Sequence, residues 1–228
     1  MGNNIVIGIE GYVGSGKTSI CRELLKKIPN SVLLHGGNLY RAIIYAFMKY
    51  GNIDLSSLKE NIHNIDARQL MDKLKIDIRI ENNETVIYID GNKIDEDLLQ
   101  SKDASLAVSI AGKEANNLAL YQFGRQIIDK FKLGYNVIVS GRALVEIYPE
   151  IDYHFLVTAS LEERINRKYI QYEEKVSKEE IRQNILLRDE LQEKSGYYKK
   201  YDKTIVVDVT ECKSVEESTQ KILEYIKL

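Results

Sequence analysis

The sequence is poor in the residues that build disulfide frameworks and metal sites. It has two cysteines, Cys21 and Cys212, without CxxC spacing, and three scattered histidines, His35, His63 and His154. Two isolated cysteines argue against a disulfide-stapled fold, and this spacing argues against a structural zinc site. They favour a reducing compartment, so we expect a cytoplasmic protein.

The chain also lacks a strong charge of one sign and a long apolar run. Its 228 residues include 32 basic and 34 acidic side chains, for a formal charge of −2. Without a basic field we expect neither nucleic acid nor an anionic membrane as a partner. The apolar runs are the length of a strand, too short to span a bilayer, and the start of the chain lacks the basic segment of a signal peptide.

What the sequence does have is an alternation of short apolar runs and helical stretches, in a length that fits one domain with a small insert. The runs predict buried strands at 5–9, 31–35, 135–141, 153–159 and 203–209. Helices are predicted at 17–28, 38–51, 56–74, 103–132, 160–173, 177–195 and 214–227. The alternation predicts an α/β fold with a five-stranded parallel sheet, helices on both faces and ligands at the carboxyl ends of the strands.

One segment breaks this rhythm. Between 75 and 95 apolar and polar residues alternate, and Asn82-Asn83 and Gly91-Asn92 mark two turns. Such a pattern predicts a small antiparallel sheet with one face in water.

The stretch GYVGSGKT, Gly11–Thr18, joins the first predicted strand to the first predicted helix. In this context GxxxxGK[ST] predicts a loop for the phosphates of a nucleoside triphosphate such as ATP. Lys17 is expected to reach the β- and γ-phosphates, and Thr18 to place its hydroxyl on Mg²⁺. The preceding carboxylate, Glu10, is the nearest candidate for a second magnesium ligand. The residues expected to surround the phosphates are Gly11, Gly14, Ser15, Gly16, Lys17 and Thr18.

A switch GTPase is one alternative, because Asn92-Lys93-Ile94-Asp95 matches a guanine-reading tetrapeptide. The match lies in the alternating segment, overlaps a Gly-Asn turn and has no Asp-x-x-Gly partner, so its Asn has a local explanation. A kinase instead needs cations around the transferred group. Candidates are Arg41 and Arg142 after predicted strands, Arg164, Arg167 and Lys168 in "SLEERINRK", and Arg188 in the next helix. Helical arginines also commonly pair with neighbouring carboxylates on a solvated face.

In this order the motifs resemble those of the bacterial cytidylate kinase family over nearly the whole chain. The counterparts are Glu10-Gly11 for the family's Asp-Gly, "HGGNLYRA" for "DTGAMYRA", "SGRA" for "DGRD", "SLEERINRK" for "SSEERxxRR" and "RDELQEKS" for "RDxxDxxR". The resemblance implies a nucleoside monophosphate kinase in a single domain, 1–228. It also implies an acceptor-binding insert at about 75–112 and a mobile lid at about 160–195.

The resemblance further implies a transfer that depends on ATP and Mg²⁺, with CMP or dCMP as the leading acceptor. Arg41 and Arg142 match family arginines that grip the acceptor phosphate, near Gly37, and Ser109 matches a base-contacting serine. Arg164 and Arg167 match lid arginines that neutralise the transferred group, and Arg188 matches the first arginine of the last helix motif. The oligomeric state is left open.

The chain departs from the family mainly where the base and sugar are read. The aspartate after Gly-Arg is Ala143, the serine or threonine of the phosphate grip is Gly36, and the later Asp and Arg of the last motif are Gln192 and Ser195. Gln192 is the candidate for the lost hydrogen-bond acceptor. Two alternatives stay open: a kinase for another small phosphorylated or hydroxylated substrate, and a nucleotide-binding protein without catalysis.

Overall fold

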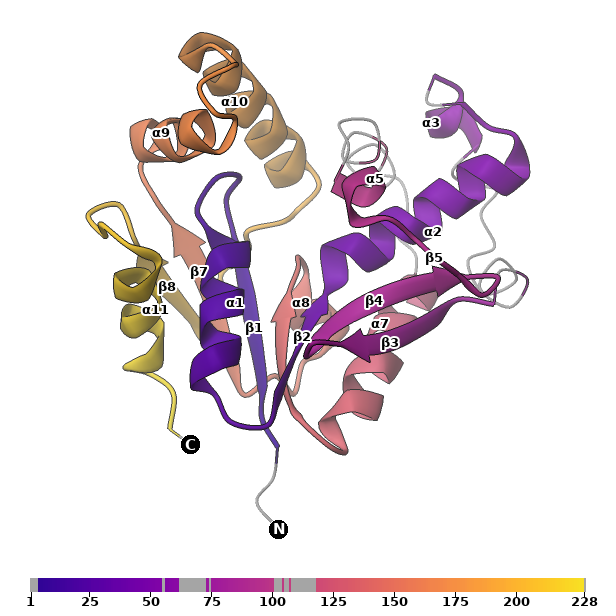
Figure 1. Ribbon diagram of the computed structural model, residues 1–228, viewed down its shortest axis with the longest axis horizontal. Coiled ribbons are helices and arrows are strands. Elements are labelled where there is room, and N and C mark those ends of the chain that lie inside the picture. The colour runs from indigo at the N-terminus through magenta and orange to yellow at the C-terminus, as the bar shows by residue number, and fades with distance from the viewer. Residues whose placement is uncertain are drawn as a thin grey trace.

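The computed structural model describes residues 4–54, 56–61, 73, 75–100, 104, 107 and 118–227. Five parallel strands form the centre of the fold (Figure 1), and all five were predicted. They lie in the order β2 (Ser31–His35), β6 (Asn136–Ser140), β1 (Val6–Gly11), β7 (Tyr153–Thr158) and β8 (Thr204–Asp208). The α/β class is therefore confirmed.

Helices cover both faces of this sheet. On one face α1 (Lys17–Lys27) and α11 (Val215–Leu223) pack on residues such as Ile7 and Ile9 of β1. On the other, α2 (Gly36–Gly51), α7 (Leu118–Lys132) and α8 (Leu144–Ile147) pack on residues such as Val6. Successive residues of β1 thus point into different cores, which requires the continuous apolar run seen in the sequence.

The alternating segment forms a hairpin, β3 (Asp77–Glu81) and β4 (Glu84–Ile89), with the short strand β5 (Asn92–Lys93) beside β4. Alternate residues of β4 are buried, as predicted for a strand with one wet face. The hairpin is not a separate sheet, however, because β4 pairs with β2 in parallel at Leu33 and Glu84. The Asn-Lys-x-Asp tetrapeptide begins in β5, which is antiparallel, so it lacks the context of a guanine site.

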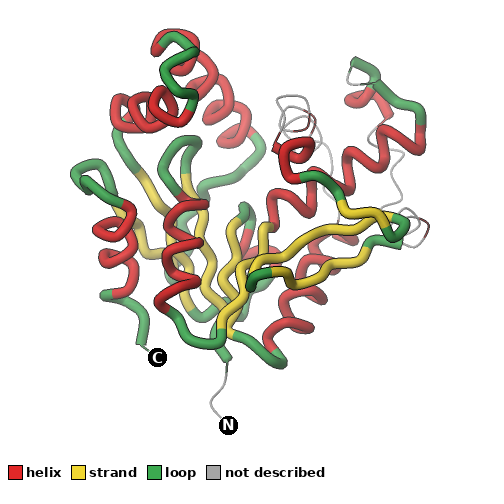
Figure 2. The backbone as a smooth tube through the Cα atoms, viewed as in Figure 1, coloured by secondary structure: helices red, strands yellow, loops and turns green. Residues whose placement is uncertain are grey.

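The remaining helices are α3 (Leu58–Asn61), α5 (Glu96–Gln100), α9 (Leu161–Gln171) and α10 (Lys178–Lys194). The helix expected at 56–74 is seen at 58–61, and most of the rest of that range lies outside the described residues, as does much of 103–117. Ser160 and Ser177 cap α9 and α10 by accepting a backbone N–H three residues on. The tube view shows α9 and α10 beyond the carboxyl ends of the strands, on the side away from both termini (Figure 2). No helix among the described residues is long and apolar enough to cross a membrane.

Candidate active site

The loop between β1 and α1 has the backbone that its glycines predict. Gly14 and Gly16 have φ of 80° and 89°, in the left-handed region that favours glycine. At Gly14 a Cβ would also come within 3.1 Å of the Arg164 carbonyl oxygen. Lys17 Nζ donates to Gly11 O at 2.5 Å and Tyr12 O at 2.9 Å, so the ammonium lies over the loop. Ser15 Oγ is buried and has no hydrogen-bond partner among the described residues.

Lys17 lies close to arginines from distant parts of the chain. Its pKa is held well below the usual value, first by burial and then by Arg142 and Arg188. Burial and the same two guanidinium groups lower the pKa of Arg41 to about 10. The loop after β1, helix α2, the turn after β6 and helix α10 therefore bring their cations to one place.

Other members of this group also lower one another's pKa. Burial and Arg142 lower the pKa of Arg188, and burial and Arg188 lower the pKa of Lys168. The Nε atoms of Arg41 and Arg188 are buried without a hydrogen-bond partner in the described part of the chain. Clustered cations that destabilise one another are stabilised by a bound anion of several charges, such as a phosphate. We call Lys17, Arg41, Arg142, Lys168 and Arg188 the cation cluster.

Helix α2 presents Arg41 from its first turns. Arg41 Nη1 donates to Asn38 Oδ1 at 3.0 Å and lies 3.4 Å from where a Cβ of Gly37 would be. Gly37 therefore lies beside the guanidinium at the N-terminus of the helix. The turn after β6 presents Arg142, whose Nε donates to Gln192 Oε1 at 2.8 Å.

Comparisons with known proteins show the family of the chain. The model of the family described as cytidylate kinase matches residues 7–228. The chain belongs to the cytidylate kinase family. The cytidylate kinase of Clostridioides difficile (strain 630) is 29% identical over 232 residues, covering 99% of each chain. That of Aquifex aeolicus (strain VF5) is 32% identical and covers 96% of this chain and 95% of that protein.

One solved structure supports the fold alone. An uncharacterized protein from Eubacterium ventriosum ATCC 27560 superposes with a TM-score of 0.51 at 14% identity, covering 98% of both chains. By family this chain is a nucleotide phosphotransferase, as its loop and motif order predict.

The two arginines that match the lid of cytidylate kinases contact the phosphate loop itself. Arg164 Nη1 donates to Val13 O at 3.2 Å and pairs with the buried carboxylate of Asp189 on α10. Arg167 donates to Ser15 O at 3.2 Å, to Val209 O at 2.7 Å and to Glu163 Oε1 at 2.8 Å. In this conformation both arginines fasten α9 to the loop, and their role toward a transferred group stays a prediction.

Sequence reasoning missed an apolar contact in the same place. Val13, a variable position of the loop motif, packs in a small core with Ile165 of α9 and Ile181 and Ile185 of α10. The motif constrains the glycines and the lysine and says nothing about Val13. The only available signal was an apolar side chain in a loop expected to face phosphates.

The carboxylate of Glu10, predicted as a magnesium ligand, is held inside the fold. Glu10 is 2% exposed, and its Oε1 accepts from Leu144 N at 2.7 Å and lies 3.2 Å from His154 Nε2. These contacts tie the end of β1 to the start of α8. They favour a structural role for Glu10, and its metal role remains a prediction. The other predicted ligand, Thr18, is exposed at the start of α1.

The departures from the cytidylate kinase motifs have partial explanations. A Cβ at Gly36 would lie 3.2 Å from Ser140 O, so the close approach of α2 to β6 disfavours the usual serine or threonine. Ala143 is 7% exposed, has φ of 54° and precedes α8. Gln192 is 5% exposed and faces Arg142 rather than standing free for a base. Ser109 lies outside the described residues.

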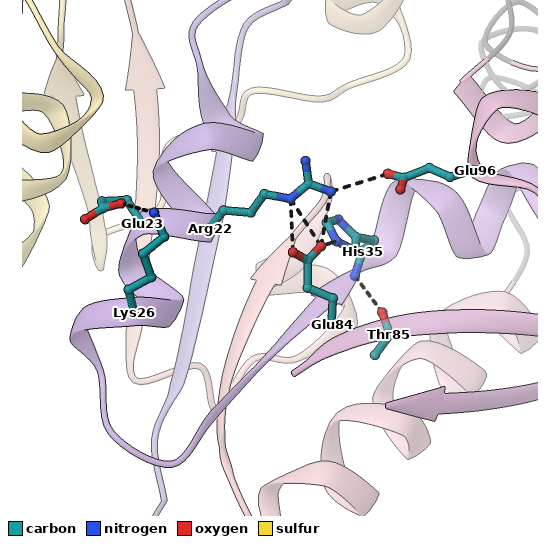
Figure 3. Close-up of polar contacts among 7 residues, drawn as sticks. All are labelled: Arg22, Glu23, Lys26, His35, Glu84, Thr85 and Glu96. Atoms are coloured by element: carbon teal, nitrogen blue, oxygen red, sulfur yellow. Dashed lines mark hydrogen bonds and ion pairs between the residues drawn. The ribbon is translucent and has the colours of Figure 1, made fainter. Parts of the chain in front are cut away.

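A polar network joins the hairpin to α1 and β2, next to the segment that carries Arg41 (Figure 3). Glu84 at the start of β4 accepts from Arg22 of α1, with Nε–Oε1 at 3.0 Å, and its Oε2 lies 2.7 Å from His35 Nε2. His35 N also donates to Thr85 Oγ1 at 3.1 Å. His35 immediately precedes Gly36 and Gly37, so the network joins the hairpin to the segment that carries Arg41.

Proposed function

We propose that this nucleotide kinase moves the γ-phosphoryl group of ATP to a nucleoside monophosphate, with CMP or dCMP as the leading acceptor. The single observation that carries the proposal is the cation cluster, in which Lys17 of the ATP loop lies close to Arg142 and Arg188. A loop that only bound ATP would not need cations from the acceptor motifs. Their convergence supports a site for two phosphate groups, one on each substrate.

The loop residues fit a triphosphate. The buried Ser15 Oγ without a partner, the left-handed glycines and the Lys17 ammonium supply donors and positive charge at the N-terminus of α1. Thr18 would hold Mg²⁺, which would supply positive charge against the negative charge that develops in the transfer. Lys17 would exchange its two carbonyl partners for phosphate oxygens.

The acceptor would bind on the side of Arg41 and Arg142. A guanidinium presents two parallel donors that suit a phosphate dianion, and Gly37 lies beside that of Arg41. We also propose that the hairpin and adjoining residues to about 112 form the acceptor-binding insert, and that residues 160–195 form the lid, within one domain. The docking of α9 on the loop supports the lid assignment, because that helix contacts the donor site directly.

The test is ADP release with Mg²⁺ and ATP, measured separately with CMP, dCMP, UMP, AMP and GMP and without any acceptor. We expect release that depends on the acceptor and is fastest with CMP or dCMP. Release only with other phosphorylated or hydroxylated compounds would replace this acceptor class. Tight ATP binding without release for any acceptor would support a protein that binds nucleotide without catalysis.

A further inference from the structure

The amide oxygen of Gln192 accepts from two donors, one of which is Arg142, the arginine proposed to bind the acceptor. Gln192 Oε1 accepts from Arg142 Nε at 2.8 Å and from the hydroxyl of Tyr198. Gln192 and Tyr198 are 5% and 7% exposed. Because the Nε–H of an arginine can only donate, the amide must turn its oxygen toward Arg142.

Tyr198 also reaches the donor loop. Its ring stacks on Tyr12 with centroids 4.2 Å apart and planes inclined by 25°. The carbonyl oxygen of Tyr12 in turn accepts from Lys17 Nζ at 2.9 Å. A continuous line of contacts therefore runs from Arg142 through Gln192, Tyr198 and Tyr12 to Lys17.

The backbone of Tyr198 is strained in a way that this line of contacts explains. Its φ is 63°, in the left-handed region that a bulky aromatic residue rarely adopts. Just before it, Tyr197 N donates to Gln192 O at 3.0 Å and closes the end of α10. The chain thus turns back so that Tyr198 can reach both Gln192 and Tyr12. Strain of this kind persists where several contacts enforce it, and it gathers at functional sites.

The neutral amide has a further consequence for Arg142. A hydrogen bond at Nε fixes the guanidinium plane and leaves the terminal nitrogens to face a second partner. A carboxylate at position 192 would fix the plane equally well, but it would pair with Arg142 and cancel its charge. Glutamine orients the arginine while leaving its full positive charge for an anion.

We propose that Gln192 and Tyr198 are positioning residues that hold Arg142 in the orientation required to bind the acceptor phosphate. The inference rests on the proposed function, in which Arg142 binds the phosphate of a nucleoside monophosphate. Neither residue is proposed to touch the reacting atoms. Because the contact is with Arg142, its loss should act on the acceptor and spare ATP.

The test uses Tyr198→Phe, which removes the hydroxyl and keeps the ring on Tyr12. We expect the KM for CMP to rise about fivefold, the effect of losing one hydrogen bond between uncharged groups, and the KM for ATP to stay within about twofold of the wild type. Tyr153→Phe is the matched control, because it removes a phenol that hydrogen-bonds the backbone of Lys227 at the amino end of β7, opposite the carboxyl ends of the strands. That control should change neither KM.

Gln192→Glu is the second variant, and it carries the test alone if Tyr198→Phe does not fold. The two side chains have nearly the same size, so we expect thermal unfolding near the wild type and a rise of tenfold or more in the KM for CMP. Unchanged KM values for CMP in the folded variants, beside an active wild type, would overturn this inference only. Equal increases in the KM for CMP and ATP would also overturn it, since they indicate a general loss of structure. A wild type that neither binds nor phosphorylates any nucleoside monophosphate would overturn the proposed function itself.

Discussion

The helix pair α9–α10 and the hairpin β3–β4 are both attached by apolar side chains and by ion pairs, but their ion pairs differ in burial. The helix pair meets the phosphate loop through the apolar side chain of Val13 and through Arg164 and Asp189, which are 8% and 7% exposed. The hairpin meets the core through buried isoleucine side chains of β3 and β4, one parallel residue pair and the network of Glu84. The Arg22 and Glu84 side chains of that network are 45% and 25% exposed.

This difference in burial indicates which of the two ion pairs can exchange its partners for water. Breaking a buried ion pair leaves an uncompensated charge, whereas a half-exposed pair exchanges its partners for water at little cost. The ion pair that holds α9 on the loop, on the proposed donor side, is therefore costly to break, and the pair that holds the hairpin, on the proposed acceptor side, costs little to break. The following predictions test the two sides in order of decreasing effect.

The largest effect is expected from Lys17→Ala on the donor side. The ammonium would neutralise charge that grows on the β- and γ-phosphates, so turnover should fall by about a hundredfold or more. Thermal unfolding should change little, because Lys17 is half-buried and bonds only to two carbonyl groups of its own loop. A folded variant with near-normal turnover would refute the assignment of the ATP site.

Removing the buried carboxylate tests the attachment of the helix pair. Asp189→Ala leaves the Arg164 guanidinium buried with Val13 O as its remaining partner, and such a loss costs about 3–5 kcal/mol of unfolding free energy. Urea unfolding should show this, with Glu84→Ala as the comparison on the hairpin side. If both variants lost the same stability, the contrast between a buried and a half-exposed ion pair would be wrong.

Arg41→Ala and Arg142→Ala test the acceptor half of the cation cluster. Each removes a fork of donors for a phosphate dianion, so the KM for CMP should rise about tenfold or more by the strength of a charged hydrogen bond. The KM for ATP should rise far less. Equal effects on both substrates would reject the placement of these arginines, and no effect would favour an acceptor without a phosphate.

Much of this arrangement could be predicted because it is local in the sequence. The run ending at Glu10, the loop glycines and Lys17 lie within thirteen consecutive residues from Ile5. Their spacing alone therefore indicates a strand, a tight loop and the start of a helix. The arginines after strands could be placed for a similar reason, since parallel strands end at the same edge.

The contacts that could not be predicted depend on residues far apart in the chain. Gln192 was expected to read a base, yet its partner is Arg142, fifty residues away. Tyr198 gave no signal, because its stack on Tyr12 exists only once α10 has folded back over the loop. The single pair between β2 and β4 is also a tertiary event, so a two-stranded pattern could not reveal that the hairpin extends the main sheet.

Ala143→Asp tests how the acceptor side reads its base. The left-handed backbone at 143 suits aspartate better than alanine, so the variant should fold. In cytidylate kinases the matching carboxylate can accept from an amino group of the base, and we expect kcat/KM for CMP to rise several-fold relative to UMP, within the roughly tenfold strength of one such bond. A natural protein that already strongly prefers CMP, together with a variant that prefers it less, would show that other residues read the base.

The smallest effect is expected from Glu84→Gln in the hairpin network. Burial alone would raise the pKa of Glu84, but hydrogen bonds from Arg22 and His35 outweigh it and hold this pKa below its usual value. A carboxylate with a lowered pKa stabilises the fold above the pKa it has when unfolded, and this contribution is lost as the pH falls through the folded value. Because the side chain is partly exposed, the variant should lose no more than about 1 kcal/mol at neutral pH.

The difference between the wild type and Glu84→Gln should therefore be present near pH 7 and should shrink as the pH falls below the ordinary glutamate pKa of about 4.3. It should disappear once the pH is below the lowered pKa of the folded state, and it should also shrink in high salt. Unfolding in urea across this pH range measures it, and Arg79→Gln is the control, since Arg79 pairs with Asp77 on the exposed edge strand β3 and does not touch the core. A loss of several kcal/mol that persists at low pH would mean that Glu84 holds the hairpin as firmly as Asp189 holds the helix pair.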